Sequence, residues 1–332
     1  MRRVGIVGAG LIGRWHAERW QQLPVELAGF YDIVPEAAQA ASEEVGGRAY
    51  ESMDALLADV DVVDVCTITT AHKDAVLAAA AAGKAIVCEK PLARHLAECE
   101  EMVAACEAAG VRLFVAQVVR FFPQFARAKA VIDEGLLGEV GVIRTIRAGR
   151  APSRPWFLDV ELSGGVIMDV SIHDIDFARW CCGEVERVFA RGLTFTDEAS
   201  GDHALITLRF TSGAIGHIEG SWSHPAGAFR TRLEIAGTEG LIEWDSQEDT
   251  SVRLAINHPN GNATRSKESP LAPQDDPYYR ELAHFLECLD SGEPFLVSPH
   301  DGLMAVKVSL AAIESMRRGE PVDIATFKEE KA

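Results

Sequence analysis

The stretch Val4-Gly5-Ile6-Val7-Gly8-Ala9-Gly10-Leu11-Ile12-Gly13 decides the fold class. It reads as a short apolar strand that runs into Gly-x-Gly-x-x-Gly and then into a helical pattern. In such a unit the first glycine permits a tight turn, the second lets the backbone approach a pyrophosphate, and the third lets the helix pack closely on the strand. The pyrophosphate lies on the amides at the helix N-terminus. We therefore expect a dinucleotide loop formed by Gly8, Ala9, Gly10, Leu11, Ile12 and Gly13.

An acidic residue, Asp32, ends the next apolar segment, about 20 positions after Gly13, as expected for a carboxylate that binds the adenosine ribose. Such a carboxylate accepts hydrogen bonds from both ribose hydroxyls and repels a 2′-phosphate. Ile33 follows it, and no Lys or Arg lies beside it in the sequence. The pattern favours NAD over NADP, with Asp32 and Ile33 at the adenosine end. The alternative is a structural glycine turn followed by a surface aspartate.

Short apolar runs alternate with helical patterns up to about residue 120. Strands are predicted over residues 4–7, 25–32, 60–67, 85–88 and 112–118, and helices over 11–22, 35–45, 73–82 and 96–109. This alternation is typical of βαβ units in a parallel sheet, and the unbroken Val/Ile character of the strands indicates that both faces are covered. The sequence predicts an α/β protein whose residues 1–120 form a doubly wound Rossmann domain.

The pattern changes after residue 120. Helices are predicted over residues 125–134, 170–180, 279–289 and 301–317, and strands separated by tight turns over 203–210, 215–222, 230–236 and 240–244. Residues 257–277 are polar and contain proline, so we expect a long excursion there. The pattern predicts that residues 121–332 form an α+β domain on a large open, mostly antiparallel sheet, half-exposed on one face.

The composition limits the classes of partner. The 32 Lys and Arg residues against 50 Asp and Glu give a net charge of −18, which disfavours nucleic acid and anionic membranes. The 7 cysteines form no Cys-x-x-Cys motif, which fits a reducing compartment. Every apolar run is much shorter than the roughly 20 residues that a membrane helix needs. We expect a cytoplasmic protein that binds a small molecule.

The second motif is Glu89-Lys90-Pro91, at the end of the predicted fourth strand. In an open parallel sheet, ligands bind beyond the carboxyl ends of the strands. The motif therefore predicts that Lys90 lies near the nicotinamide end of the cofactor. The alternative is a surface lysine at a strand–helix junction.

The third motif runs from Gly164-Gly165 to Asp169, His173 and Asp176. Asp169 and His173 are four residues apart, which places them on one helical face, and Asp176 continues that face. An Asp beside a His orients the imidazole and stabilises its protonated form, as a general acid/base requires. A metal site is disfavoured because no second His or Cys lies nearby at ligand spacing. A structural His in an amphipathic helix is the other alternative.

Together the three motifs resemble the Gfo/Idh/MocA family, the group of glucose–fructose oxidoreductase and inositol dehydrogenase, over essentially the whole chain. The resemblance implies an N-terminal Rossmann domain that binds NAD, and a C-terminal sheet through which subunits form a homodimer or homotetramer. It also implies that Lys90, Asp169 and His173 match the catalytic Lys, Asp and His of inositol-dehydrogenase-like members, where they contact the substrate.

Further candidates follow from the same resemblance. In the family, the segment after the third predicted strand often flanks the cofactor, which adds Thr67, Ile68, Thr69 and His72 to Glu89 and Lys90 as cofactor-binding candidates. Ile68 stands where many members have proline. The Arg120-Phe121-Phe122-Pro123 element resembles the family's Arg-aromatic-x-Pro element, which we expect to be mainly structural, with Arg120 as a candidate substrate contact.

A run of arginines precedes Trp156. Arg144, Arg147, Arg150 and Arg154 have no acidic residue among them. At an active-site mouth they would bind a carboxylate or phosphate, and Trp156 would stack on a sugar face. The alternative is that these arginines line an exposed strand and pair with acids elsewhere.

These features predict an NAD-dependent dehydrogenase that transfers hydride between a secondary alcohol of a cyclic polyol, sugar or sugar derivative and nicotinamide. In this hypothesis His173 accepts the hydroxyl proton, directly or through Lys90, and Lys90 stabilises the alkoxide. Asp169 orients His173 or binds a neighbouring hydroxyl. Two other functions stay open: an oxidoreductase or glycosidase with tightly bound, recycled NAD, and a non-catalytic NAD-binding sensor.

Overall fold

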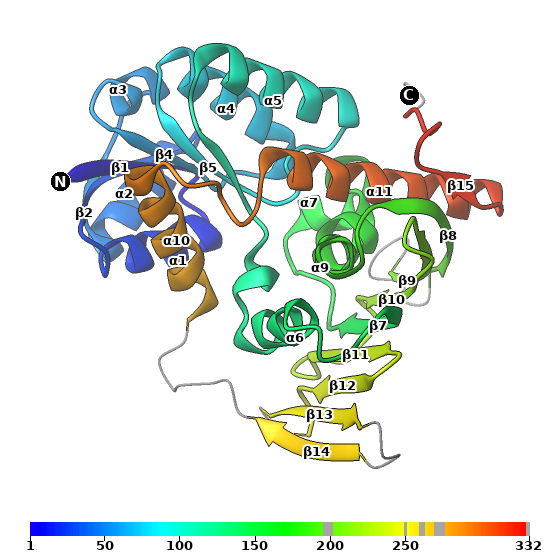
Figure 1. The fold of residues 1–332 in the computed structure, drawn as a ribbon. Helices are drawn as coiled ribbons and strands as arrows, with labels where there is room; N and C mark the ends of the chain where they lie inside the picture. The colour runs from blue at the N-terminus through cyan, green and yellow to red at the C-terminus, as the bar shows by residue number, and fades with distance from the viewer. Residues whose placement is uncertain (195–201, 249–250, 259–262, 269–275, 330–332) are drawn as a thin grey trace. The chain divides into compact units, whose positions relative to one another are not determined.

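The computed structural model describes residues 1–194, 202–248, 251–258, 263–268 and 276–329. The chain forms two compact units (Figure 1). The first comprises residues 1–118 and 276–303, and the second comprises residues 119–275 and 304–332. The sequence-based range 121–332 assigned residues 276–303 to the second domain. In the structure they return to the first unit, because a helix in this segment buries its apolar side chains there.

A parallel six-stranded sheet forms the centre of the first unit. Its order is β3-β2-β1-β4-β5-β6, the doubly wound order in which the chain starts in the middle and winds to both edges. The strands are β1 (Arg2–Val7), β2 (Val25–Tyr31), β3 (Arg48–Ala49), β4 (Val62–Val65), β5 (Ala85–Glu89) and β6 (Leu113–Ala116). All five strand pairs are parallel, which confirms the predicted fold class of this part.

Helices lie on both sides of this sheet. Figure 1 shows α4 and α5 on one side, and α1 and α10 on the other. The helices are α1 (Leu11–Trp20), α2 (Pro35–Val45), α3 (Met53–Leu57), η1 (Thr69–Ala71), α4 (His72–Ala81), α5 (Leu96–Ala109) and α10 (Pro277–Ser291). Phe285 of α10 packs edge-on against Trp20 of α1, with ring centroids 6.1 Å apart, so burial of large aromatic rings holds α10 on this unit.

The second unit is built on a nine-stranded sheet of order β14-β13-β12-β11-β7-β10-β9-β8-β15. The strands are β7 (Val140–Ala148), β8 (Val185–Leu193), β9 (His203–Phe210), β10 (Ile215–Ser221), β11 (Arg230–Gly237), β12 (Gly240–Asp245), β13 (Val252–Asn257), β14 (Ala263–Glu268) and β15 (Val322–Asp323). Among the described strands of this sheet, only β7 and β10 pair in parallel, so the predicted mostly antiparallel sheet is confirmed.

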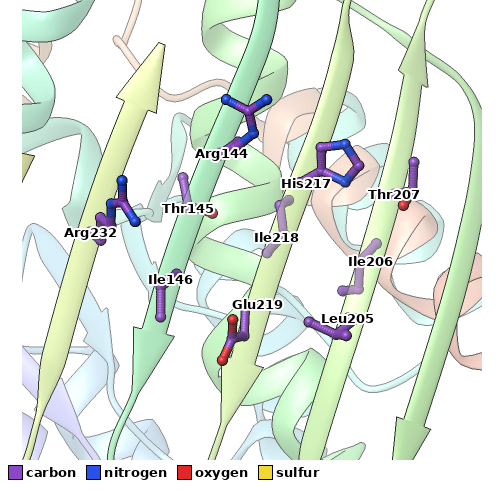
Figure 2. Close-up of a pocket in the computed structure, with 10 residues that line it drawn as sticks. All are labelled: Arg144, Thr145, Ile146, Leu205, Ile206, Thr207, His217, Ile218, Glu219 and Arg232. Atoms are coloured by element: carbon purple, nitrogen blue, oxygen red, sulfur yellow. The ribbon is translucent and has the colours of Figure 1, made fainter. Parts of the chain in front are cut away.

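Helices cover one face of this sheet, and the described strands carry exposed side chains on the other face. The helical elements are η2 (Val118–Phe121), α6 (Pro123–Asp133), α7 (Pro155–Leu158), α8 (Val160–Ser163), η3 (Ile167–Ser171), α9 (Ile172–Cys182) and α11 (Pro299–Arg318), whose first residues belong to the first unit. α9 and η3 pack on β7 and β10. We call the opposite side the outer face, and Figure 2 shows side chains of β7, β9, β10 and β11 around a hollow there.

Two expectations about local structure need correction. The polar stretch 257–277 is not a continuous excursion, because β14 forms within it and pairs with β13. Residues 259–262 and 269–275 of that stretch lie outside the described part of the chain. Residues 48–57, for which no element was predicted, form the short β3 and α3. These elements are too short for sequence periodicity to reveal them.

In the part of the chain that the structure describes, no helix combines the length and apolar character required to cross a membrane.

Candidate active site

The glycine loop has the backbone geometry that a dinucleotide requires. Gly8 has φ +103°, and a Cβ there would lie 2.6 Å from the carbonyl carbon of Cys66. A Cβ on Gly13 would lie 2.0 Å from the carbonyl oxygen of Gly8, so helix α1 packs on the turn as closely as glycine allows. The amide of Arg14 donates a hydrogen bond to the carbonyl oxygen of Gly10 at 3.1 Å. The amides of Leu11 to Gly13 precede it, in the first turn of the helix. These residues fit a pyrophosphate at the helix N-terminus.

Asp32 lies directly beside this loop. Its Oδ2 accepts a hydrogen bond from the amide of Ala9 at 2.8 Å, and its Oδ1 accepts one from the amide of Val34 at 2.9 Å. An ionised carboxylate has about four acceptor positions, so positions remain for ribose hydroxyls. Ile33 is 88% exposed at the same edge. The side chains therefore fit the adenosine end of NAD.

The segment from Thr67 to His72 is tied to the turn that carries Lys90. Nδ1 of His72 lies 2.9 Å from the carbonyl oxygen of Pro91, and Nε2 lies 3.2 Å from that of Thr67. Burial lowers the pKa of His72, and its neutral imidazole donates to one carbonyl at a time. Ile68 is 41% exposed and Thr69 is buried. Cofactor contact by this segment stays a prediction, but its position at the carboxyl end of β4 is the one that the prediction requires.

Glu89 and Lys90 lie at the carboxyl end of β5, in the strand beside β4. Glu89 is 8% exposed, and its Oε2 accepts a hydrogen bond from the amide of Lys90 at 3.0 Å. The carboxylate thus fixes the backbone from which the Lys90 side chain extends. Both residues lie at the strand end where ligands bind in open parallel sheets.

Asp169 and His173 lie in the second unit, on either side of the junction between a π-helical turn and an α-helix. Asp169 belongs to η3, a π-helical turn over Ile167–Ser171, and His173 belongs to the first turn of α9. Both side chains are half-buried, although most of their neighbours are fully buried. π-helical turns occur frequently at functional sites. Asp176, expected on the same face, is fully buried.

Two buried ion pairs fix α9. Arg120 donates from Nε and from its second terminal nitrogen to the two carboxylate oxygens of Asp176, at 2.8 and 2.7 Å. Arg147 donates from Nε to Oδ2 of Asp174 at 2.8 Å. Arg120 is 2% exposed, so the guanidinium that was a candidate substrate contact holds this helix in place. Its contact with substrate stays a prediction.

The arginines before Trp156 do not form one surface. Arg144 lies on the outer face and pairs with Glu234, whereas Arg147 points to the buried face of the same strand, because residues three apart in a strand face opposite sides. Arg150 and Arg154 are exposed beyond the strand. Trp156 is half-buried and stacks on Phe157 with ring centroids 3.8 Å apart. Its role toward a sugar stays a prediction.

A buried polar cluster in the first unit was not predicted from the sequence. We call it the His16 cluster; its members are His16, Asp64, Cys66, Glu89 and Glu281. One signal was present, because Asp64 interrupts the apolar run Val62–Val65 of a strand buried on both faces. Glu281 had no comparable signal, since it lies in an ordinary amphipathic helix that is distant in sequence.

Comparison with known proteins supports the class of protein that this geometry indicates. Residues 2–117 match the family model described as an oxidoreductase family with an NAD-binding Rossmann fold, and residues 125–243 match that of the GFO/IDH/MocA C-terminal domain. The chain is 35% identical to myo-inositol 2-dehydrogenase of Thermotoga maritima over 97% of this chain and 98% of that protein.

Two further relatives agree. The scyllo-inositol 2-dehydrogenase (NAD(+)) of Bacillus subtilis is 30% identical over 97% of this chain and 96% of its own. The solved structure of an oxidoreductase from Agrobacterium radiobacter, in complex with NAD+, L-tartaric acid and magnesium, superimposes with a TM-score of 0.87 at 26% identity, covering 98% of each chain.

The fold and the glycine-loop site thus define an NAD-dependent oxidoreductase. The chain belongs to the Gfo/Idh/MocA family. The resemblance stated from the three motifs is confirmed.

Proposed function

We propose that this protein is a dehydrogenase that oxidises a secondary alcohol of a cyclic polyol, sugar or sugar derivative, with NAD as the hydride acceptor. The observation that carries the proposal is the conjunction of the glycine loop, Asp32 and Lys90 at the carboxyl end of one parallel sheet. Relatives that act on inositols, at 35% and 30% identity over nearly the whole chain, support the substrate class.

The residues divide into cofactor and substrate groups. Gly8 to Gly13 would hold the pyrophosphate, and Asp32 with Ile33 would hold the adenosine ribose. Thr67 to His72 and Glu89 would flank the nicotinamide end. When bound, NAD supplies the carbon that accepts the hydride. We assign the chemistry on the substrate to Lys90, Asp169 and His173, with Trp156 and Arg120 as further candidates for substrate contact.

Each catalytic side chain has a role that its chemistry allows. His173 accepts the proton of the substrate hydroxyl at an imidazole nitrogen. The Lys90 ammonium stabilises the negative charge that develops on that oxygen, an interaction that is strongest in the transition state. Asp169 orients His173 or accepts a hydrogen bond from a neighbouring hydroxyl. The Arg120–Asp176 and Arg147–Asp174 pairs hold the helix of His173 rigid.

A cofactor titration followed by a substrate screen tests the proposal. We expect NAD to bind more tightly than NADP, and one or more cyclic polyols, aldoses or sugar acids to reduce the bound NAD. NADH that forms once and stays bound would indicate recycled cofactor instead. Tight NAD binding without turnover on any of these compounds would contradict the proposal and favour a sensor.

We infer a homodimer or homotetramer joined through the outer face of the nine-stranded sheet. Leu205 of β9 and Ile215 of β10 are 52% and 42% exposed on neighbouring strands of that face (Figure 2 shows Leu205). Leu205 lines a hollow of about 310 Å³, together with the apolar side chain of Ile146. Contact with a second copy of the chain would remove these apolar side chains from water, which favours a subunit interface on this face. Light scattering should give two or four chains for the wild type, and Leu205→Glu should lower that number.

We also propose a cytoplasmic location. All seven cysteines are free thiols, and burial raises the pKa of Cys182 to about 12, which keeps that thiol unreactive. Free cysteines in this number favour a reducing compartment. Fractionation of the native host should place the protein with cytoplasmic enzymes.

A further inference from the structure

The His16 cluster is an unusual arrangement of ionisable groups. His16 of α1, Asp64 of β4 and Glu281 of α10 are fully buried, and Cys66 and Glu89 are 7% and 8% exposed. Three carboxyl groups thus meet one imidazole away from solvent. Buried carboxylates are costly unless each is paired or protonated.

Asp64 has the partners that an ionised carboxylate requires. Its Oδ2 lies 2.9 Å from Nδ1 of His16 and accepts a hydrogen bond from Nε1 of Trp20 at 2.7 Å. Its Oδ1 accepts a hydrogen bond from Sγ of Cys66 at 3.3 Å. Burial raises the pKa of Cys66, so this thiol stays neutral and donates. Asp64 is therefore the anion on the Nδ1 side of the ring.

Two carboxyl groups face the other nitrogen. Nε2 of His16 lies 3.2 Å from Oε1 of Glu89 and 3.9 Å from Oε1 of Glu281. The three ligand atoms lie within 4.8 Å of one another. Neither oxygen of Glu281 has a hydrogen-bond partner among the residues that the structure describes. One imidazolium carries a single positive charge against the three carboxyl groups of Asp64, Glu89 and Glu281, which favours protonation of at least one of these acids.

The surroundings identify Glu281 as that acid. Burial raises the pKa of Glu281 well above its ordinary value, and the negative groups Glu89, Asp64 and Asp276 act in the same direction against the opposing effect of His16. Burial opposes the charged form of His16, yet Cys66 and Asp64 raise its pKa well above its ordinary value. Because the Cys66 thiol is neutral, we attribute that effect to Asp64. The ring of Tyr278, 6.0 Å from that of His16, completes the surroundings on the α10 side.

Glu89 connects the cluster to Lys90. One of its oxygens faces His16, and the other accepts the hydrogen bond from the Lys90 amide at 3.0 Å. A second negative charge on Glu281 would repel Glu89 and shift the backbone that carries Lys90. A displacement of about 1 Å at a reacting group can cost about a hundredfold in rate.

We propose that Glu281 is protonated beside Glu89 and His16, and that this buried network positions Lys90 for the reaction. Glu281 and His16 are thus positioning residues that act through Glu89. The role of Lys90 in this inference rests on the proposed function, whereas the protonation of Glu281 does not.

A divalent cation bound by His16, Glu89 and Glu281 is the competing explanation, since these are nitrogen and oxygen donors within ligand distance of one another. Elemental analysis of the dialysed protein separates the two. We expect less than one tenth of an equivalent of any divalent metal. About one equivalent in the wild type, lost in Glu281→Gln, would overturn the assignment of a proton to Glu281.

Infrared spectroscopy tests the proton directly and without turnover. At neutral pH the wild type should show the C=O band of a protonated carboxylic acid, and this band should shift when glutamate is labelled with carbon-13. The band should vanish in Glu281→Gln and persist in Glu287→Gln, a matched control because Glu287 is exposed on the same helix. A wild type without a glutamate-sensitive band would overturn the proposal even if no variant folded.

The pH profile tests the positioning role. In the wild type, kcat should fall at alkaline pH as the network loses its proton, and Glu281→Gln should keep kcat within about threefold at pH 7 without that fall. Glu281→Leu should lower kcat about tenfold to a hundredfold, with the KM for NAD nearly unchanged. Equal decreases in kcat in the Gln and Leu variants, with an unaltered pH profile, would show that Glu281 has a merely structural role. Absence of any turnover in the wild type would refute the proposed function but leave the infrared result valid.

Discussion

Nε of Arg147 donates a hydrogen bond to Oδ2 of Asp174 at 2.8 Å inside the second unit. Asp174 directly follows His173 in the sequence. The side chains of Arg147 and Asp174 are both buried, so this ion pair joins the C-terminal end of β7 to the first turn of α9 without competition from water. The segment that carries the proposed base is therefore held by a charge pair as well as by packing.

Replacing Arg147 by Met should destabilise the second unit strongly. The substitution leaves Asp174 buried without its cation, which typically costs about 3–5 kcal/mol. Arg144→Met is the control on the same strand, because Arg144 is half-exposed and its pair with Glu234 should contribute less than about 1 kcal/mol. Urea denaturation followed by circular dichroism measures both. Equal decreases in the free energy of unfolding of the two variants would show that burial of the pair does not contribute to stability.

Gly13→Ala should weaken NAD binding and destabilise the first unit. The added Cβ would lie 2.0 Å from the Gly8 oxygen, so α1 must move away from the loop. We expect the Kd for NAD to rise about tenfold or more, because the amides at the helix N-terminus move with α1. In Gly141→Ala the new Cβ meets only the Ala236 oxygen at 3.8 Å, and binding should not change. Calorimetric titration that gives equal Kd values for both variants would contradict this assignment.

Asp32→Asn should shift cofactor preference toward NADP. The amide keeps an oxygen for the Ala9 amide but loses the charge that repels a 2′-phosphate. Hydrogen bonds to a charged group contribute about 1.5–3 kcal/mol, so kcat/KM with NAD should fall about tenfold to a hundredfold. Glu36→Gln removes a charge from an exposed position in the first turn of α2 and serves as the control. An unchanged ratio of NAD to NADP activity in Asp32→Asn would exclude Asp32 from the ribose site.

Asp245→Asn should lower stability at neutral pH but not in acid. The hydrogen bond from Arg230 holds the pKa of Asp245 below its ordinary value of 3.8. The carboxylate therefore stabilises the fold above about pH 3.8, and this contribution is lost as the pH falls through the lower folded pKa. Unfolding measured at several pH values should show a wild-type advantage at pH 7 that shrinks in acid. A difference independent of pH would mean that the charge of Asp245 does not contribute.

The fold was predictable where local pattern and tertiary structure agree. The glycine loop, the apolar strands and Asp32 are local features, and the structure places them as the pattern predicts. The return of α10 to the first unit depends on contacts between residues far apart in sequence, such as Trp20 and Phe285. A single sequence carries no signal for such a pairing.

The same limit applies to the candidate site. Lys90, Asp169 and His173 were found from motifs, and their roles stay proposals. The partners of Arg120 and Arg147 lie 56 and 27 positions away, and Glu281 joins His16 through a helix in the last fifth of the chain. Burial and pairing of these charges decide their function, and both are properties of the folded chain.

Transfer of deuterium from a substrate carbon to NAD tests the central claim most directly. A cyclic polyol that supports turnover would be deuterated at its secondary carbons and mixed with enzyme and NAD in a single-turnover experiment, with deuterium on the nicotinamide measured by mass spectrometry. We predict near-stoichiometric transfer by the wild type, and transfer about a hundredfold to a thousandfold slower in Lys90→Met, which should still bind NAD. NADH formed without deuterium, or equal rates in wild type and variant, would contradict the account.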